Sequence, residues 1–238
     1  MSRLSVVVPM LNEGSVIGDT LAALRTGAPN AEIVVVDGGS TDQSVDVARK
    51  FADRVVGASR GRARQMNAGA ALGSGEILAF VHADTWVPYS FEKDILDALG
   101  ESGIVGGRFD IELDDSSFVY RLIGDLISLR SRITRTATGD QAIFVRRSVF
   151  ESLGGFPDFD LCEDLDFSRR LKRVGGVACL RSRVTTSARR WRRAGLARTV
   201  LRMWAIRGLY LLGVPPSRLK QIYADTREAG TVGRPWIG

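Results

Sequence analysis

The fold is decided by residues 5–37, SVVVPMLNEGSVIGDTLAALRTGAPNAEIVVVD. Residues 5–8 and 33–36 are short apolar runs rich in β-branched side chains, which are typical of buried strands. Between them, apolar residues recur at the spacing of one helix face, at Ile17, Leu21 and Leu24. A strand, a helix and a second strand in this order predict a βαβ unit, in which the two strands lie parallel.

The same alternation continues outward from this unit to residue 100. Ser40-Thr-Asp-Gln43 has the spacing of a capping box and predicts the start of a helix that continues through Phe51. We expect strands at residues 54–57 and 77–81, and helices over residues 61–72 and from Pro88 to Gly100. This order predicts an α/β fold with a mainly parallel central sheet flanked by helices.

Residues 101–188 alternate less regularly, with strands expected at residues 106–113 and 142–145 and helices at residues 118–129 and 162–174. From Trp191 onward, apolar residues at helical spacing are interleaved with arginines, until Pro215-Pro216 interrupts the pattern before a last short helix. We therefore divide the chain into residues 1–100, residues 101–188 and a C-terminal, basic, amphipathic helical extension, residues 189–238.

The composition limits the class of protein. Of the 238 residues, 45% are hydrophobic and 25% are charged, which suits one or two packed domains. No apolar stretch reaches the ~20 residues of a membrane-spanning helix, and the first residues lack the pattern of a signal peptide. Without an export signal, we expect Cys162 and Cys179 to be reduced thiols and the protein to be cytoplasmic.

Charge is distributed unevenly along the chain. Residues 167–224 contain 15 Lys or Arg and no Asp or Glu, whereas the remaining 180 residues contain 18 basic and 27 acidic side chains. The formal net charge of +6 therefore combines an acidic body with a basic C-terminal quarter. Such a segment is typical of surfaces that meet anionic lipid, nucleic acid or phosphorylated substrates, and a solvated arginine-rich surface is the alternative.

Acidic residues follow three of the predicted strands. Asn12 and Glu13 come after the first strand, Asp37 follows the second, and His82-Ala-Asp84 follows the strand at residues 77–81. In open α/β sheets, ligands bind outside the carboxyl ends of the strands. Any one of these acids could cap a helix or lie in a solvated turn, but three at one sheet edge predict a ligand site.

The sequence does not support several common kinds of binding site. No G-x-G-x-x-G follows the first strand and no G-x-x-x-x-G-K-[ST] occurs, so a dinucleotide site and a P-loop both lack direct support. His82 is the only histidine, which excludes a His-rich zinc site. Two cysteines far apart in the sequence also argue against structural zinc.

Several segments, in their order and spacing, resemble the signatures of family 2 glycosyltransferases of the GT-A fold. They are Val6-Val-Val-Pro-Met-Leu-Asn-Glu13, Val36-Asp-Gly-Gly-Ser-Thr-Asp42, Gly61-Arg-Ala-Arg-Gln-Met-Asn-Ala-Gly69, Phe80-Val-His-Ala-Asp84, Gly139-Asp-Gln-Ala-Ile-Phe-Val-Arg-Arg147, Gly154-Gly-Phe156 and Glu163-Asp164. The resemblance covers about residues 4–187 and is nearest to a subgroup of small bacterial members. It implies a Rossmann-like GT-A catalytic domain over residues 1–188, in which residues 1–100 bind a nucleotide sugar and residues 101–188 bind the acceptor.

The resemblance implies roles for the strand-end residues of the first half. The nucleoside of the donor would be held by the turn after the first strand and by groups near it: Pro9, Asn12, Glu13, Asp37, Arg62 and Asn67. Asp84 matches the second acid of the family's Asp-x-Asp motif, in which a carboxylate binds Mn²⁺ or Mg²⁺ against the donor diphosphate. His82 replaces the first acid; direct ligation by His82 would favour Mn²⁺, and the alternative is a supporting or packing role.

The acid pair Glu163-Asp164 supplies two candidates for the general base that glycosyl transfer to a hydroxyl requires. Successive helical residues point ~100° apart, so only one of the pair is expected to face the sugar, and the family match places the base on Asp164. The positive end of the helix dipole favours an ionised carboxylate there, and simple capping of the helix is the alternative. The acceptor would be bound near Gly139, Asp140 and Gln141, and the family match implies inversion.

Ser187-Ala-Arg-Arg-Trp191 resembles a degraded Gln-x-x-Arg-Trp signature of processive members, with Ser187 in place of glutamine. This difference, together with the missing membrane channel, favours transfer of a single sugar. The tail has the composition of a helix that lies in the headgroup plane of an anionic membrane, which would suit a lipid-linked acceptor and a peripheral location on the inner face of the cytoplasmic membrane. Packing of its apolar residues against the catalytic domain or a second subunit is the alternative.

The sequence therefore predicts a metal-assisted glycosyltransferase. A different class of protein, a non-catalytic module that binds a nucleotide sugar and recruits a partner through the basic tail, is the alternative. We expect no nucleic-acid partner, because the chain has no recognised module and few aromatic residues among the arginines: Trp191, Trp204 and Tyr210.

Overall fold

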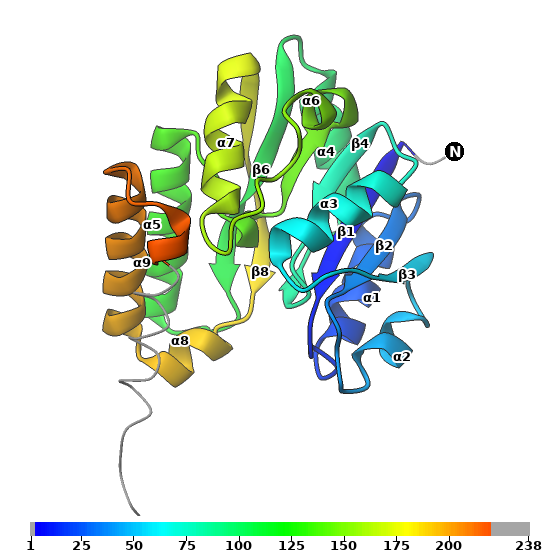
Figure 1. The fold of residues 1–238 in the computed structure, drawn as a ribbon, viewed down its shortest axis with the longest axis horizontal. Coiled ribbons are helices and arrows are strands. Elements are labelled where there is room, and N and C mark those ends of the chain that lie inside the picture. Colours follow the sequence, from blue (N-terminus) through cyan, green and yellow to red (C-terminus); the bar gives the residue numbers. More distant parts are fainter. Residues whose placement is uncertain (1–2, 220–238) are drawn as a thin grey trace, which may run out of the picture.

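The computed structural model describes residues 3–219, which form an α/β fold around one eight-stranded sheet (Figure 1). The strand order across the sheet is β3-β2-β1-β4-β7-β6-β8-β5. The strands are β1 (Leu4–Met10), β2 (Glu32–Asp37), β3 (Arg54–Gly57), β4 (Ile77–Phe80), β5 (Thr85–Trp86), β6 (Ile104–Leu113), β7 (Ile143–Arg146) and β8 (Gly176–Thr186). The helices are α1 (Ile17–Gly27), α2 (Ser44–Ala48), α3 (Arg62–Leu72), α4 (Phe91–Gly100), α5 (Phe118–Thr134), the 3₁₀ helix η1 (Gly139–Gln141), α6 (Arg147–Ser152), α7 (Glu163–Val174), α8 (Arg189–Ala194) and α9 (Leu196–Leu211).

Strands β1 to β4 are parallel neighbours, as the alternation in the sequence predicts. β1 pairs with β2 so that Met10 is level with Asp37, and with β4 so that Val7 is level with Phe80. β7 then pairs antiparallel with β4 and β6, and β6 runs parallel to β8. The loops that follow β1, β2 and β4 therefore leave the sheet at one edge.

The central strands face a separate core on each side of the sheet. Val6 and Val8 of β1 pack with α1 and α4 on one face, whereas Val7 packs with α3, α6 and α7 on the other. Gly69 of α3 lies so close to the sheet that a Cβ there would clash with Cγ1 of Val7. This close approach fixes α3 against the sheet, and the first turn of α3 carries Arg62.

Strand β8 is a long element that the sequence analysis does not predict. It pairs with β6 along most of its length, and Arg183 projects from it to form a salt bridge of 2.7 Å with Asp125 of α5. Arg181 and Arg183 interrupt its apolar character, so the segment resembles the basic tail that follows it. The sheet is therefore wider than the sequence predicts.

Two helices of the tail form a further layer next to α5 (Figure 1). Trp191 of α8 is buried against Ile111 of β6 and Ile127 of α5, and Leu209 of α9 packs in a small cluster near the start of α7. The prediction of one uninterrupted helix from Trp191 onward is wrong, because Gly195, with φ at 80°, separates α8 from α9. Trp191 and Leu209 therefore pack against the body of the protein. Most of the last predicted helix lies outside the described residues.

Two predicted helix starts are also wrong. α2 begins at Ser44, and the hydroxyl of Ser40 does not cap it but donates to Asp37 Oδ1 at 2.5 Å. α4 begins at Phe91, three residues after Pro88. The turn after β2 is therefore a loop held by its own side chains, and this loop borders the candidate site.

Both cysteines carry free thiols, as the sequence analysis predicts. Burial, together with nearby carboxylates, raises the pKa of the Cys162 thiol to about 12, so this thiol is not a nucleophile at neutral pH. Within residues 3–219, no helix is both long enough and apolar enough to cross a membrane.

Candidate active site

The loops after β1 and β2 hold each other in place. The backbone N–H of Asn12 donates to Ser40 Oγ at 2.8 Å, and Asn12 Oδ1 accepts the N–H of Thr41 at 2.8 Å. The N–H of Glu13 donates to Ser44 Oγ at 2.7 Å. Asn12 takes a left-handed backbone conformation, with φ at 53°, which asparagine tolerates better than most residues. The two loops and the strand ends before them, residues 9–16 and 37–43, therefore form one continuous surface, which we call the strand-end wall.

Asp37 and Pro9 belong to the strand-end wall. The Asp37 carboxylate accepts the N–H groups of Gly39 and Ser40, both at 3.0 Å, and the hydroxyl of Ser40. Because a carboxylate offers about four acceptor positions, Asp37 can accept a further hydrogen bond from a ligand. Pro9 is half-buried in β1, level with Val36 of β2.

Gln65 of α3 supports this wall from beneath. Its Nε2 donates to the backbone oxygens of Met10 and Val36, both at 2.8 Å. The amide lies directly against Gly38, where a Cβ would be 3.0 Å from Nε2. Gln65 therefore ties the ends of β1 and β2 to α3, a role that its position in the Arg-Gln-Met-Asn run does not reveal.

Asn67 has a structural role in the same helix. Its Nδ2 donates to the backbone oxygen of Phe156 at 2.8 Å, and its Oδ1 accepts the N–H of Phe156 at 2.9 Å. Both ends of the Asn67 amide are thereby occupied by the loop that follows α6. This contact joins the two halves of the chain, and the expected role of Asn67 in binding the donor stays a prediction.

Arg62 and Glu163 form an ion pair between the two halves of the chain. Arg62 Nη1 lies 3.3 Å from Glu163 Oε1, and the Glu163 side chain is only 3% exposed. Burial and the neighbouring Asp164 raise the pKa of Glu163 to about 7, against the opposing effect of Arg62. Burial also disfavours the charge on Arg62, but the carboxylates around it outweigh that effect and raise its pKa. Glu163 can therefore gain or lose a proton near neutral pH, which would change the charge of its ion pair with Arg62.

Asp164 lies beside η1 and His82. Its Oδ2 accepts the N–H of Gly139 at 2.6 Å. A Cβ on Gly139 would be 2.6 Å from His82 Nε2 and 3.5 Å from Asp164 Oδ2, so only glycine fits between them. Burial raises the pKa of Asp164, although Arg62 and the two backbone N–H groups oppose this. The sequence analysis expected the helix dipole to favour the ionised carboxylate, whereas burial shifts the pKa of Asp164 the other way.

The three residues expected to bind the acceptor form η1. Gly139 donates to Asp164, as described above, and Asp140 is half-buried with an Oδ1 that has no hydrogen-bond partner among residues 3–219. Gln141 is fully buried, and its Nε2 donates to the backbone oxygen of Phe109 at 3.3 Å. Gly139 and Asp140 therefore border the site, whereas Gln141 holds η1 in position.

A family model described as Glycosyl transferase family 2 matches residues 5–154, which is more than half of the chain. The chain belongs to glycosyl transferase family 2. The PGL/p-HBAD biosynthesis glycosyltransferase of Mycobacterium bovis is a relative, 30% identical over 182 residues that cover 70% of this chain and 68% of that protein. The chain is therefore a glycosyltransferase.

Solved structures of other glycosyltransferases share this fold. TarS 1–349 of S. aureus, in complex with UDP-GlcNAc, has a TM-score of 0.63 at 21% identity, over 79% of this chain and 59% of that one. The mannosyltransferase PcManGT of Pyrobaculum calidifontis, in complex with GDP-Man and Mn²⁺, has a TM-score of 0.66 at 20% identity, over 87% of this chain and 61% of that one. The match spans about three fifths of these solved chains. The fold is GT-A, as the resemblance implied.

The glycosyltransferase offers few protein groups to a divalent cation. Across residues 3–219, no three His, Cys, Asp or Glu side chains lie close enough together to hold a metal ion. Asp84 presents a carboxylate that is 30% exposed, and the His82 ring packs against Gly139. Mg²⁺ commonly takes one or two protein carboxylates and completes its ligands with substrate phosphates and water. Asp84 fits a metal of this kind, which the donor diphosphate would help to hold.

Arg189 is a residue of this site that the sequence analysis placed only in the tail. Its Nη2 lies 2.9 Å from Glu13 Oε2 and 3.7 Å from Asp84 Oδ2. The first residue of α8 therefore reaches the strand-end wall and Asp84. Its place inside Ser187-Ala-Arg-Arg-Trp191 is the one signal in the sequence that could have indicated this contact.

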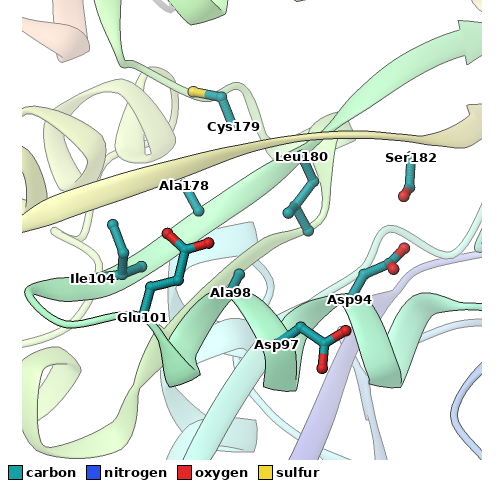
Figure 2. A pocket seen from close by; sticks show the side chains of 9 residues that line it. All are labelled: Asp94, Asp97, Ala98, Glu101, Ile104, Ala178, Cys179, Leu180 and Ser182. Atoms are coloured by element: carbon teal, nitrogen blue, oxygen red, sulfur yellow. The ribbon is translucent and has the colours of Figure 1, made fainter.

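A hollow of about 360 Å³ lies elsewhere on the glycosyltransferase, between α4 and β8 (Figure 2). Two carboxylates of α4 and that of Glu101, which follows the helix, line it together with residues of α4, β6 and β8: Asp94, Asp97, Ala98, Glu101, Ile104, Ala178, Cys179, Leu180 and Ser182. In Figure 2 the Cys179 side chain points away from the carboxylates. The hollow contains no residue of the strand-end wall or of the acid pair, so it is separate from the candidate active site.

Proposed function

We propose that this glycosyltransferase transfers a single sugar from a nucleoside-diphosphate sugar to an acceptor hydroxyl, with inversion at the anomeric carbon and with Mn²⁺ or Mg²⁺. One observation carries this proposal: Arg62 connects the strand-end side of the sheet to the buried acid pair of Glu163 and Asp164. A cation suited to a phosphorylated donor and carboxylates that could accept a proton thereby lie next to each other.

The donor would lie on the strand-end wall. Asp37 would accept a hydrogen bond from the nucleoside, with Pro9, Asn12 and Glu13 shaping the surface around it. Two cations, Arg62 and Arg189, are available for the diphosphate. The nucleotide sugars in the TarS and PcManGT complexes, UDP-GlcNAc and GDP-Man, support a donor of this class.

The metal ion would be held by Asp84 and the diphosphate. When bound, such a cation offsets the negative charge that develops on the leaving diphosphate. Arg189 Nη2 lies 3.7 Å from Asp84 Oδ2, so this arginine would lie beside a diphosphate held at Asp84. Mn²⁺ in the PcManGT complex supports a divalent metal, and His82 would support the site through its packing on Gly139.

Asp164 would act as the general base. The acceptor oxygen forms a bond to the anomeric carbon, its proton passes to Asp164, and the bond from that carbon to the diphosphate oxygen breaks. A base on the face opposite the leaving group is what a single displacement with inversion needs. The raised pKa of Asp164 makes it a stronger proton acceptor than an exposed carboxylate.

The acceptor side would face an anionic membrane that carries a lipid-linked acceptor. Helices α5 and α9 lie side by side (Figure 1) and expose a set of large apolar side chains, which we call the α5–α9 face: Phe118, Leu122, Leu126, Leu129, Ile133, Leu201, Trp204 and Leu211. Exposed arginines accompany them, including Arg121 and Arg198. Apolar residues beside arginines are complementary to the interface of an anionic bilayer.

Thermal unfolding with a panel of sugar nucleotides, with Mn²⁺ or with chelator, tests the proposed donor and metal sites. A donor at 100 times its dissociation constant adds ~2.7 kcal/mol to the free energy of unfolding. Asp84→Ala should remove the Mn²⁺-dependent part of this stabilisation, whereas Asp46→Ala, an exposed carboxylate on α2, should retain it. An unchanged Mn²⁺ effect in Asp84→Ala would place the metal elsewhere.

A further inference from the structure

Two arginines from different helices lie beside Asp164. Arg130 belongs to α5 and Arg207 to α9, and Nη2 of Arg207 donates to Thr136 Oγ1 at 2.6 Å. Arg207 is close enough to both Arg130 and Asp164 to interact with them electrostatically, and Arg130 interacts with Asp140 and Asp164. We call Arg130 and Arg207 the arginine pair.

Within the described residues, the arginine pair combines buried donors that lack a partner with guanidinium groups that form no salt bridge. Nε and Nη2 of Arg130 and Nη1 of Arg207 are buried, and no hydrogen-bond partner reaches them from residues 3–219. Within the same residues, neither guanidinium makes a salt bridge. Arg108 also has a buried Nε without a partner, but its guanidinium is paired with Asp110. Buried donors without partners are unfavourable, so they indicate a ligand that satisfies them.

The charges around the arginine pair also favour an anionic ligand. Burial and the repulsion from Arg130 lower the pKa of Arg207 to about 10, even though Asp164 favours its charge. Burial also lowers the pKa of Arg130, with Arg108 adding to this effect and Asp140 and Asp164 opposing it. The nearby carboxylates therefore do not neutralise the pair, and an anion placed between the two guanidinium groups would do so.

We propose that the arginine pair binds a phosphate group of the acceptor and so positions the acceptor hydroxyl at Asp164. The inference rests on the proposed function, because it assigns the acceptor of the same reaction. Guanidinium groups bind phosphate oxygens through paired N–H donors, which makes two adjacent arginines well suited to a phosphate. In the transfer step the acceptor phosphate stays intact: the hydroxyl oxygen bonds to the sugar, its proton passes to Asp164, and the nucleoside diphosphate leaves.

The phosphate could belong to a lipid headgroup or to a water-soluble acceptor. Arg130 and Arg207 belong to α5 and α9, the two helices that carry the α5–α9 face. A lipid whose headgroup meets this face would therefore bring its phosphate to the part of the molecule that contains the arginine pair. The recognition chemistry is the same for the two sources. Inorganic phosphate and vesicles containing phosphatidic acid therefore serve as separate probes.

The test measures binding of each probe to the full chain in chelator and without donor, by calorimetry for inorganic phosphate and by co-sedimentation for vesicles. Arg130→Gln and Arg207→Gln should each weaken binding of at least one probe by about tenfold or more, as expected for a lost charge-assisted contact. Arg49→Gln and Lys50→Gln each remove one exposed charge just after α2, on the opposite side of the molecule from α5 and α9 (Figure 1), and each should change binding of either probe less than about twofold. Arg207→Lys keeps the charge without the paired donors and should also weaken binding.

A structural role for the pair would give a different result. Because the two cations repel each other, Arg207→Gln and Arg130→Gln should melt no lower than the wild-type protein when phosphate is absent. Equal losses in pair and control variants, no loss with either probe, or displacement of phosphate by UDP or GDP would overturn the assignment to the acceptor. Donor binding is measured separately, so a chain that binds phosphate through the pair but no sugar nucleotide would retain the anion site and lose the proposed function.

Discussion

The proposed donor side and the proposed acceptor side of the site are built in different ways. On the donor side, the loops after β1 and β2 satisfy each other's polar groups, and Gln65 holds both strand ends from beneath. On the acceptor side, the acid pair is buried with raised pKa values, and the arginine pair has buried donors without partners. The first arrangement is complete without a ligand, whereas we propose that substrate completes the second.

We infer from this difference that one side of the site binds the donor and the other side transfers the proton. Groups that are fully paired contribute to stability and to a preformed surface. Buried titratable groups with perturbed pKa values are typical of residues that transfer protons. Substitutions on the donor side should therefore change stability and donor affinity, and those on the acceptor side should change turnover.

Asp164→Asn should have the largest effect. The amide keeps the size of the side chain and can still contact η1, but it cannot take the acceptor proton, so turnover should fall at least ~10²-fold. Donor affinity should change little, which calorimetry with the preferred sugar nucleotide would measure. A loss of donor affinity with turnover preserved at saturation would instead place Asp164 on the donor side.

Glu163→Gln tests the charge of the acid pair through stability. The pKa of Glu163 rises from 4.5 to about 7 in the folded protein, so the folded state binds the proton more tightly than the unfolded state. Stability from this group is full below pH 4.5 and is lost as the pH rises through about 7. At pH 8, Glu163→Gln should therefore raise the free energy of unfolding, by the order of 1–3 kcal/mol, and flatten its pH dependence. A lower free energy of unfolding for Glu163→Gln at pH 8 would show that the attraction between Glu163 and Arg62 outweighs the cost of burying the Glu163 charge.

Gln65→Leu tests the donor side. The substitution leaves the backbone oxygens of Met10 and Val36 without their side-chain donor, which should lower the free energy of unfolding by about 2 kcal/mol. Donor affinity should fall as well, because the strand-end wall loses its support. Gln43→Leu, at an exposed position in the adjoining loop, serves as the control and should leave both quantities nearly unchanged.

Trp204→Ser tests the α5–α9 face and should have the smallest effect. Trp204 is 70% exposed, so its loss should not change unfolding, but it should weaken binding to anionic vesicles by about 1 kcal/mol. Leu72→Ser, an exposed leucine at the end of α3, is the matched control. Equal recovery of the wild-type protein in the supernatant with anionic and neutral vesicles, at low and high salt, would remove the membrane proposal.

The elements of the first half follow from local signals in the sequence. β1, β2 and β4 are apolar runs between helices with clear apolar faces, so their order predicts a parallel sheet. β8 escaped prediction because Arg181 and Arg183 lie within it, and its pairing with β6 depends on residues about 70 positions away. Ser40 matched a capping box, yet Asn12 and Asp37 use its hydroxyl, a contact that no local pattern contains.

In the candidate site, too, contacts between residues far apart in the sequence could not be predicted. The acids after β1, β2 and β4 could be placed at one sheet edge from topology alone. The contact of Arg189 with Glu13 joins residues 176 positions apart, and the arginine pair depends on how α9 packs next to α5. Sequence periodicity assigns such arginines to a solvated or membrane-facing surface, whereas the packing of the tail turns some of them inward.

Release of nucleoside diphosphate tests the central claim most directly, namely that this site transfers sugar. The wild-type protein and Asp164→Asn would be incubated with UDP- and GDP-sugars, Mn²⁺ and a membrane lipid extract as the source of acceptor, and bound and released nucleotide would be measured in the same samples. We expect the wild-type protein to release diphosphate from one class of donor, and Asp164→Asn to bind that donor without releasing it. Binding without release by both proteins would contradict the account and indicate a nucleotide-sugar-binding module.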